Sequence, residues 1–592
     1  MSARSMIRES RRRERRNRRR AGVAAAAALG AVALGPSPAS ANDFEVNSLV
    51  DPGDGTCSAT CTLRDAVDDA NANGGTPDTI TFKSGLSGTI RLTPNNEIYI
   101  GYPTKIVGPG EDKLTISGDS NSDGHVNSGD SGIFRSYLTT DVSISGMTLT
   151  GGAGAGGSRG GAIYATYVEH LTLDHVTITN GGADGGGATY TNHVGLTVTN
   201  STFSGNLGSV GGTIDAYDTP HVSSYPSSLV VRNSTFENNR SSVGGGILIQ
   251  DVPDFTIENT TISGNAATYG GAGGGGGLYV QDDATGVIRN STISGNLSAF
   301  TGGGIQTHGL QGKLTIENST IAGNVSAEVG GGIDNWDASQ SLVMKSSIVA
   351  SNKPNDLSSE NASVSMTPTF SLIGNPGNAP LIVSTTNKLG VDPQLGPLAD
   401  NGGPTKTMLP AASSPALDAG VADGLTTDQR GLARTFESPP ANAAGSDGTD
   451  IGAVEYADTS VDSPSASAKR KQRAKGGKVK VVVEAGAGEA VTVEATGTIK
   501  LKGGKGGKGG KTKRAKAKSV LLRGGPVDAA AGERGKLTLT PAKRSDGRKL
   551  AKALKGRKLK VAIEVTLTDG SGNSVSEPLK VTLSGSKRKK PK

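Results

Sequence analysis

A repeated pattern between Val142 and Asn352 constrains the fold of this chain more than any other feature. Each copy has a short run of alternating apolar and polar residues, then Asn-Ser-Thr followed by Phe or Ile, then Gly-Asn and a Gly-rich run. One threonine of each copy recurs about every 25 to 33 residues, a period typical of solenoids. These threonines are Thr177, Thr202, Thr235, Thr261, Thr292 and Thr320.

Three short strands fit into each repeat, for example residues 314–316, 320–322 and 332–334. Each strand alternates with period two and is rich in Thr, Ile and Val, which suits a half-buried pleated surface. No helix fits between the strands, and the L-x-x-L-x-L pattern of leucine-rich repeats is missing. The repeats therefore predict an all-β fold, a right-handed parallel β-helix, over residues 136–390.

Asparagine and glycine mark the corners of the predicted coils. Asn tolerates the left-handed backbone region and bonds to local backbone, so corner asparagines of successive coils can stack as ladders. The Gly runs allow tight corners. The Asn-x-Ser/Thr triplets also match glycosylation acceptors, but a ladder explains their period without any sugar.

Residues 1–41 have the features of an export signal. The segment 11–20 is highly basic, residues 21–35 form a short apolar run, and Ala39-Ser40-Ala41 is a small-residue cleavage site. The paired arginines leave a twin-arginine route open. The leader predicts a secreted protein, associated with the cell wall or free, and no other segment is predicted to span a membrane.

Residues 42–135 are predicted to close the first end of the solenoid. Cys57 and Cys61 are the only cysteines, and in an exported protein they are expected to form one small disulfide; two buried thiols are the alternative. Thr62 can cap a helix that carries Leu63, Val67 and Ala70 on one face. The stretch CTLRDAVDDANA followed by DTITF resembles the CSLREA domain, which implies a secreted bacterial β-helix protein.

A polar loop at residues 119–130 has the spacing of a calcium loop. Its ligand positions are held by Asp119, Asn121, Asp123, His125, Asn127 and Asp130. Gly124 occupies the turn position and Val126 the apolar position. The loop resembles those of EF-hands and dockerins, although position 12 is Asp instead of Glu. It predicts a calcium cofactor; a polar surface loop is the alternative.

The strand that follows each Gly-rich run is predicted to turn one face to solvent. In residues 186–192, alignment on the glycines places Ala188 and Tyr190 inward. Aromatic rings beside carboxylates and amides suit sugar binding, because rings stack on sugar faces and polar groups bind hydroxyls. A solvated sheet with scattered aromatics is the alternative. The residues of this predicted ligand-binding face are Tyr164, Asp215, Tyr217, Tyr279, Gln281, Gln306, His308, Asp334 and Trp336.

Residues 391–458 lack the repeat pattern. They contain, in order, D-N-G-G-P-T, S-P-A-L-D-A-G, D-Q-R-G and D-I-G-A-V-E. These motifs resemble the choice-of-anchor Q domain, which closes many bacterial β-helix proteins. The resemblance implies surface display and no catalysis.

The composition changes from Thr459 onward. A basic linker (459–477) leads to a Lys/Gly-rich domain (478–585), predicted as a small β-sandwich with a Gly/Lys insertion at 502–518, and to a basic tail (586–592). Acidic residues dominate from 42 to 460, and basic residues dominate beyond. The basic part is predicted to bind a cell-envelope polyanion or its own acidic β-helix. Specific nucleic-acid binding is not expected, because no aromatic residues interleave with the basic ones.

The sequence favours a non-catalytic, monomeric protein that binds glycans or the cell envelope. The repeats resemble those of polymorphic membrane protein adhesins. Polysaccharide-cleaving β-helix enzymes need paired carboxylates at a set separation or a calcium with an arginine base. No motif set of the polygalacturonase type is present, so no catalytic residue is assigned. The alternative is a polysaccharide lyase or glycoside hydrolase that acts on an acidic polysaccharide.

Overall fold

The computed structural model contains two compact units, one of residues 1–436 and 440–456 and one of residues 437–439 and 457–592. The predicted leader before Ala41, most of the Gly/Lys insertion and the basic tail lie outside the described residues. The residues that the structure describes are 41–127, 129–154, 160–219, 225, 227–269, 273–309, 311–336, 342–360, 365–434, 442–456, 464–474, 479–487, 491–501, 518–530, 532–569 and 573–585.

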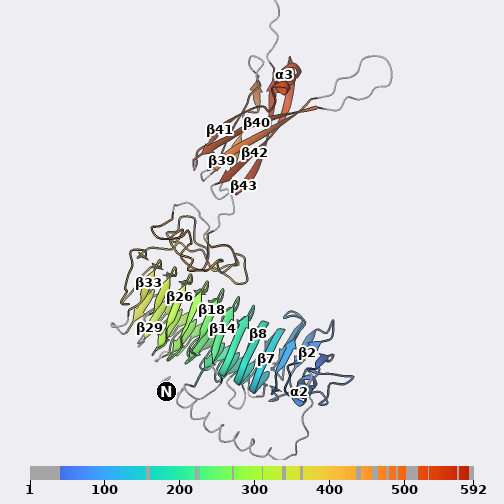
Figure 1. Cartoon of the computed structure of the whole chain (residues 1–592), viewed down its shortest axis with the longest axis vertical. Helices are drawn as coiled ribbons and strands as arrows, with labels where there is room; N and C mark the ends of the chain where they lie inside the picture. Colours follow the sequence, from blue (N-terminus) through green and yellow to red (C-terminus); the bar gives the residue numbers. More distant parts are fainter. Residues whose placement is uncertain are drawn as a thin grey trace, which may run out of the picture. The chain divides into compact units, whose positions relative to one another are not determined.

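The first unit is a parallel β-helix whose rungs follow one another from β2 to β33 (Figure 1). Each rung contributes strands to three long stacks, and three long strands turn corners and so belong to more than one stack. These are β7 (Phe134–Thr150), β8 (Ile163–Thr179) and β10 (Thr189–Thr199). All pairings between rungs are parallel, as predicted.

The remaining strands fall into the three stacks in chain order. Stack 1 holds β4 (Ile98–Ile100), β13 (Ile214–Tyr217), β17 (Ile247–Gln250), β21 (Leu278–Gln281), β25 (Ile305–His308), β29 (Ile333–Trp336) and β32 (Leu357–Ser359). Stack 2 holds β1 (Asp43–Val46), β2 (Asp78–Phe82), β5 (Thr104–Val107), β14 (Ser228–Arg232), β18 (Phe255–Glu258), β22 (Gly286–Arg289), β26 (Leu314–Glu317), β30 (Val343–Lys345) and β33 (Thr367–Thr369). Stack 3 holds β3 (Gly88–Arg91), β6 (Leu114–Ser117), β11 (Thr202–Ser204), β15 (Thr235–Glu237), β19 (Thr261–Ser263), β23 (Thr292–Ser294), β27 (Thr320–Ala322), β31 (Ile348–Ala350), β34 (Leu372–Ile373) and β35 (Lys388–Leu389).

A fourth stack of two-residue strands follows stack 3 and was not predicted. It contains β9 (Gly182–Ala183), β12 (Leu207–Gly208), β16 (Arg240–Ser241), β20 (Ala266–Ala267), β24 (Leu297–Ser298) and β28 (Val325–Ser326). A buried asparagine precedes each of the last five strands. Asn265 Nδ2, for example, donates a hydrogen bond to Asn296 Oδ1 at 3.0 Å, and Asn265 Oδ1 accepts one from Asn239 Nδ2 at 2.9 Å. The predicted corner ladder is thereby confirmed.

Inward side chains of all three long stacks form one apolar core along the β-helix. The predicted register is wrong by one residue in the coil 186–192. Thr189, not Ala188, pairs with both Ile163 and Ile214, so Tyr190 lies in the outward column beside Tyr164. The alignment relied on the glycines, and this coil carries one Gly more than its neighbour before the strand.

The helix α2 (Leu63–Asn73) covers the first end of the β-helix, as predicted. Its buried Leu63, Val67 and Ala70 belong to the same core as the first rungs. Thr62 is the N-cap, and a capping box joins it to Asp65: Thr62 Oγ1 accepts from Asp65 N at 3.2 Å, and Thr62 N donates to Asp65 Oδ2 at 3.1 Å. The open apolar edge that a solenoid end would expose is therefore covered.

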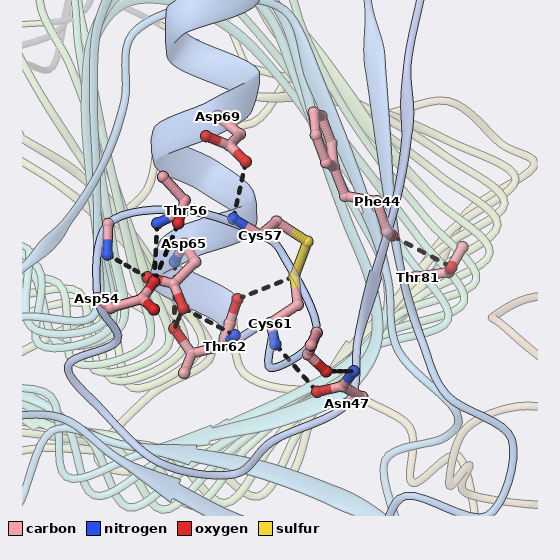
Figure 2. The surroundings of a disulfide bond; sticks show 12 residues. Phe44, Asn47, Asp54, Thr56, Cys57, Cys61, Thr62, Asp65, Asp69 and Thr81 are labelled. Carbon is pink, nitrogen blue, oxygen red and sulfur yellow. Dashed lines mark hydrogen bonds between the residues drawn. A yellow bond between two sulfur atoms is a disulfide. The ribbon is translucent and has the colours of Figure 1, made fainter.

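A disulfide between Cys57 and Cys61 precedes this helix (Figure 2). The backbone N–H of Cys57 donates to Asp69 on α2 at 2.8 Å, and that of Cys61 donates to Asn47 Oδ1 at 3.0 Å. These bonds tie the small loop both to the helix and to the chain that follows β1.

The segment 391–456, here called the return segment, leaves the last rung and runs back along the outside of stack 3. Among its described residues it has only isolated β-bridges. Its contacts reach outward threonines of three successive rungs. Thr261 Oγ1 donates to Lys406 O at 2.5 Å, Thr292 Oγ1 donates to Gln429 Oε1 at 2.6 Å, and Thr320 Oγ1 accepts from Ala453 N at 3.0 Å.

The second unit is a curved, mostly antiparallel sheet with its own core. Its elements are β36 (Ser465–Ser467), β37 (Lys471–Arg473), β38 (Val481–Gly486), β39 (Val491–Leu501), β40 (Lys518–Ala529), β41 (Gly535–Pro541), α3 (Arg544–Ala553), β42 (Lys558–Asp569) and β43 (Ser574–Ser584). The strand order is β36-β38-β41-β40-β39-β42-β43-β37. Gln472 of the edge strand β37 bonds to the backbone N–H and C=O of Val482 in β38, which brings the two sides of the sheet together around one core. Helix α3, which was not predicted, buries Leu550 in that core.

Across the described ranges, no helix combines the length and the apolar character that crossing a membrane requires.

Candidate functional site

The outer face of stack 1 carries all nine residues of the predicted ligand-binding face. Strand pairing places them in two columns, because side chains alternate between core and exterior. The first column runs through Tyr99, Arg135, Tyr164, Tyr190, Asp215, Leu248, Tyr279, Gln306, Asp334 and Ser358. The second runs through Tyr137, Thr166, Asn192, Tyr217, Gln250, Gln281, His308 and Trp336.

The predicted exposure of this face to solvent is wrong for six of the nine residues. Tyr164, His308 and Trp336 are half-buried. The six buried residues are Asp215, Tyr217, Tyr279, Gln281, Gln306 and Asp334.

The corner that precedes each strand covers this part of the face. Val243, in the corner before β17, packs with Leu248 and Tyr279 in a small apolar cluster outside the main core. The ring of Phe300, in the corner before β25, lies 4.7 Å from that of Trp336. The alternating pattern of a strand tells which side chains point outward but not whether a neighbouring corner folds over them.

Asp334 is the most enclosed carboxylate of the face. Ser358 Oγ donates to its Oδ1 at 2.5 Å, and Gln306 Nε2 donates to its Oδ2 at 3.3 Å. Burial raises the pKa of Asp334, and the bonds from Ser358 and Gln306 only partly offset that effect. Four rung steps separate Asp334 from Asp215. At a rung spacing of about 4.8 Å this separation is about 19 Å.

The open part of the face lies over the earlier rungs, where tyrosines gather. The ring of Tyr167 stacks on His193 at 4.9 Å. The rings of Tyr137 and Tyr225 meet Tyr167 edge-on at 5.8 and 6.4 Å. Tyr137 is 36% exposed, so this group is accessible to a ligand.

A second aromatic row lies in the neighbouring column. Tyr164 stacks on the buried Tyr190 at 5.5 Å, and the guanidinium of Arg135 lies 5.3 Å from the centre of the Tyr164 ring. This distance suits a cation–π contact. Arg135 Nη1 is also 3.9 Å from Glu97 Oε2. Tyr99, paired with Arg135 in the register, is 48% exposed and ends the row.

We call these residues together the tyrosine patch. Its members are Tyr99, Arg135, Tyr137, Tyr164, Tyr167, Tyr190, His193 and Tyr225. It holds six of the 11 tyrosines of the chain. Sequence reasoning found only Tyr164, because it followed the Gly-rich repeats and misplaced Tyr190; the clustering of Tyr between 99 and 225 was the available signal.

His193 anchors the patch to the next rung. Its side chain is 1% exposed, and Nδ1 lies 2.7 Å from Asp218 Oδ1. His193 and Tyr167 both occupy a corner position with positive φ (57° and 55°), which aligns the two rings on successive rungs. The stack of rings is therefore set by the backbone of the corners.

The predicted calcium loop is held closed by its own carboxylates. Asp119 Oδ2 accepts from Gly124 N at 3.1 Å, and Asp123 Oδ1 accepts from His125 N at 2.8 Å. Asp130 is fully buried and accepts from Ser120 N at 3.0 Å and Asn127 N at 2.8 Å. In the portion of the chain that is described, no group of three or more His, Cys, Asp or Glu side chains is arranged to hold a metal. Calcium binding therefore stays a prediction.

The comparisons with known proteins concern the β-helix. Residues 112–274 and 245–375 match the family model described as a right handed beta helix region. A search of curated proteins found no match. Among solved structures, the crystal structure of bacteriophage CBA120 tailspike protein 3 shares 10% sequence identity with this chain at a TM-score of 0.23. The alignment covers 55% of this chain and 58% of the tailspike chain, less than two thirds of the latter. The matched residues, which include the strands from β6 to β34, form a right-handed parallel β-helix.

Proposed function

We propose that this protein is a secreted or cell-surface β-helix protein that binds glycans without cleaving them, through the tyrosine patch. The observation that carries the proposal is the gathering of partly exposed tyrosine rings and one arginine on the open part of the stack 1 face. Tyrosine offers an apolar ring and a hydroxyl together, which is the combination that sugar recognition needs.

The ring orientations define how a sugar would be held. Tyr164 stacks on the buried Tyr190, with 13° between their planes, and Arg135 lies over its ring, so Tyr164 offers its edge and hydroxyl group more than a ring face. Tyr137 stands at 90° to Tyr167, so its ring lies across the stack. We therefore assign hydroxyl recognition to Tyr164 and ring stacking to Tyr137. Arg135 adds a positive charge that suits a uronic acid.

The two carboxylates of the predicted ligand-binding face are too far apart to act as a glycosidase pair. Glycoside hydrolysis uses two carboxylates about 5 to 10 Å apart. Asp215 and Asp334 are about 19 Å apart by the rung count and are both buried. The alternative, a polysaccharide lyase or glycoside hydrolase that acts on an acidic polysaccharide, would have to use another pair.

The test is binding of neutral and uronate oligosaccharides to the full chain and to Tyr137→Ala and Tyr164→Ala variants. Each variant should bind about tenfold more weakly, a loss of about 1.4 kcal/mol, because each loses one ring or hydroxyl contact. Tyr102→Ala is the matched control, since Tyr102 is 45% exposed and lies outside the patch.

Unchanged binding by both patch variants would contradict the assignment of the site. Release of reducing ends or of unsaturated sugars from any of these glycans would instead establish the enzymatic alternative.

A further inference from the structure

The edge of the second unit brings together basic residues that are far apart in the sequence. Register pairs Lys560 with Thr582 and Thr582 with Lys471 across β42, β43 and β37. In the same way Lys558 pairs with Ser584, which pairs with Arg473.

Lys580 of β43 lies on the same side, paired with Ala562 of β42. Alternation places these cations on the outer side of the sheet, because Val561, Ile563, Val581 and Leu583 point into the core. We call the five residues the basic face. They are Lys471, Arg473, Lys558, Lys560 and Lys580, and all are exposed.

The charges of the basic face are not neutralised within the unit. None of the five forms a salt bridge with another described residue. By contrast, Lys536 on β41 is paired with Glu484 on β38 at 3.3 Å. The acidic Glu564 lies farther along β42, beyond Ala562. The unit therefore has a concentration of uncompensated cations at one edge.

The spacing of the basic face suits a linear polymer with regularly placed anionic groups. Neighbouring strands lie about 4.8 Å apart, and residues two apart on a strand are about 6.7 Å apart. Lysine side chains can therefore meet phosphate or carboxylate groups that recur every few ångströms along a chain. Such binding gains free energy from the release of counterions.

The composition of the unit argues against recognition of nucleobases. Residues 457–592 contain no Phe, Tyr, Trp or His. Proteins that bind single-stranded nucleic acid stack bases on aromatic side chains, and this unit has none. A polyanion without bases is the better match.

We propose that the basic face of β42, β43 and β37 is a binding site for a linear polyanion that carries repeated phosphate or carboxylate groups, separate from the tyrosine patch. This site would attach the protein to an anionic polymer of a cell envelope, while the β-helix binds its own ligand.

The test compares two triple variants of the full chain that remove equal charge. Lys471→Ser, Lys560→Ser and Lys580→Ser remove part of the basic face. Arg523→Ser, Arg534→Ser and Lys536→Ser are the matched control, since these residues are exposed on β40, directly before β41 and on β41, away from β37.

Binding is measured with inorganic polyphosphate, polygalacturonate and single-stranded DNA at several salt concentrations. The basic-face variant should bind polyphosphate or polygalacturonate at least about tenfold more weakly. Its association constant should also depend less on salt: the negative slope of log K against log salt should become smaller in magnitude by about two. The control should change both much less. Stronger binding to one polymer would identify phosphate or carboxylate as the recognised group.

Equal weakening of the two variants would show a net-charge effect and overturn the proposal, and so would unchanged binding by the basic-face variant. DNA bound more tightly than both other polymers would overturn the choice of a base-free polymer. Unchanged far-ultraviolet circular dichroism of the variants would show that folding is intact. Glycan binding by the tyrosine patch is measured separately, so failure of one proposal leaves the other in place.

Discussion

At the scale of single residues, asparagines of the repeat have two structural roles. Those of the Gly-Asn motif are buried and bond from rung to rung, as at Asn265. Those of the Asn-Ser-Thr motif sit at corners with positive φ, 51° at Asn233 and 47° at Asn290. Asn233 Nδ2 bonds to Asn200 at 3.3 Å, whereas Asn290 Nδ2 bonds to Thr427 O of the return segment at 2.8 Å. The period of the Asn-x-Ser/Thr triplets therefore has a structural cause.

Single side chains of the loop 119–130 also determine how tightly it would bind calcium. We predict weak calcium binding by the loop 119–130, with a dissociation constant of about 10⁻⁴ M, because position 12 is Asp130 rather than a bidentate Glu. Titration calorimetry of the full chain with calcium should give a heat that disappears in an Asp119→Ala, Asp123→Ala variant.

The matched control for this experiment is Asp184→Ala, which changes an exposed carboxylate outside the loop. A wild-type chain that gives no calcium heat, or a double variant that gives the full heat, would show that the loop is an ordinary polar turn.

At the scale of elements, the return segment depends on buried charges. Arg434 is fully buried; its guanidinium donates to Asn290 Oδ1 of the β-helix at 2.6 Å and to Gly452 O at 3.0 Å. It also lies 3.5 Å from Glu455 Oε2. Arg430 and Asp428 pair at 2.8 Å nearby. The conspicuous D-Q-R-G and D-I-G-A-V-E motifs thus fasten the return segment to the outside of the β-helix.

Two carboxyl groups of this network have raised pKa values. Burial raises the pKa of Asp450 to about 7 and that of Glu455 to about 8. Repulsion from Asp418 adds to the first shift and repulsion from Asp450 to the second, whereas Arg434 opposes both. The other groups that face the pair are Asp418, Asp428 and Arg430, and also Asp447 close to Arg434.

We predict that the return segment becomes less stable as pH rises from 5 to 8. A carboxyl group whose folded pKa is raised stabilises the fold below its unfolded pKa, and this stabilisation is lost as pH rises toward the folded pKa. The loss should be about 1.4 kcal/mol per pH unit for each of the two groups that is still protonated in the folded state. It should level off above pH 8. Denaturant unfolding of the first unit across this range measures it.

Glu455→Gln is the control for the pH experiment, because glutamine keeps the size of the side chain and cannot ionise. The variant should show a shallower pH dependence between 5 and 8. A wild-type stability that rises over this range, or a variant with the same slope, would contradict the assignment to this pair.

At the scale of the whole molecule, the two units have separate cores. The core of the β-helix contains residues up to Ile373, and that of the second unit begins at Ala474. The single tryptophan, Trp336, lies in the first unit against Phe300. Tryptophan fluorescence therefore reports on the β-helix alone, whereas circular dichroism reports on the strands of both units.

We predict two unfolding transitions for the full chain, because units with independent cores unfold independently. Circular dichroism should show both transitions in denaturant, and tryptophan fluorescence should follow only that of the β-helix. The isolated first unit, residues 41–456, should keep the fluorescence transition. A single transition that coincides in both probes would show that the units unfold together.

Much of the fold could be predicted from the sequence because it depends on local periodicity. The alternation in runs such as 314–316 and 320–322 defines strands, and the repeat forces one rung to stack on the next. The cap at Thr62 and the asparagine ladder are also local patterns that repeat or follow known capping rules. The sequence by itself therefore determined the β-helix, its cap and, outside the coil 186–192, the columns of residues that share a face.

Exposure and proximity were decided only by the tertiary structure. Val243, in a corner, covers Tyr279 of β21, and Gln429, in the return segment, covers Thr292 of β23. Neither covering residue belongs to the strand that it covers. The tyrosine patch and the basic face each join side chains from separate rungs or strands through register. Strand patterns specify which face a side chain takes, but burial of that face depends on contacts made elsewhere along the chain.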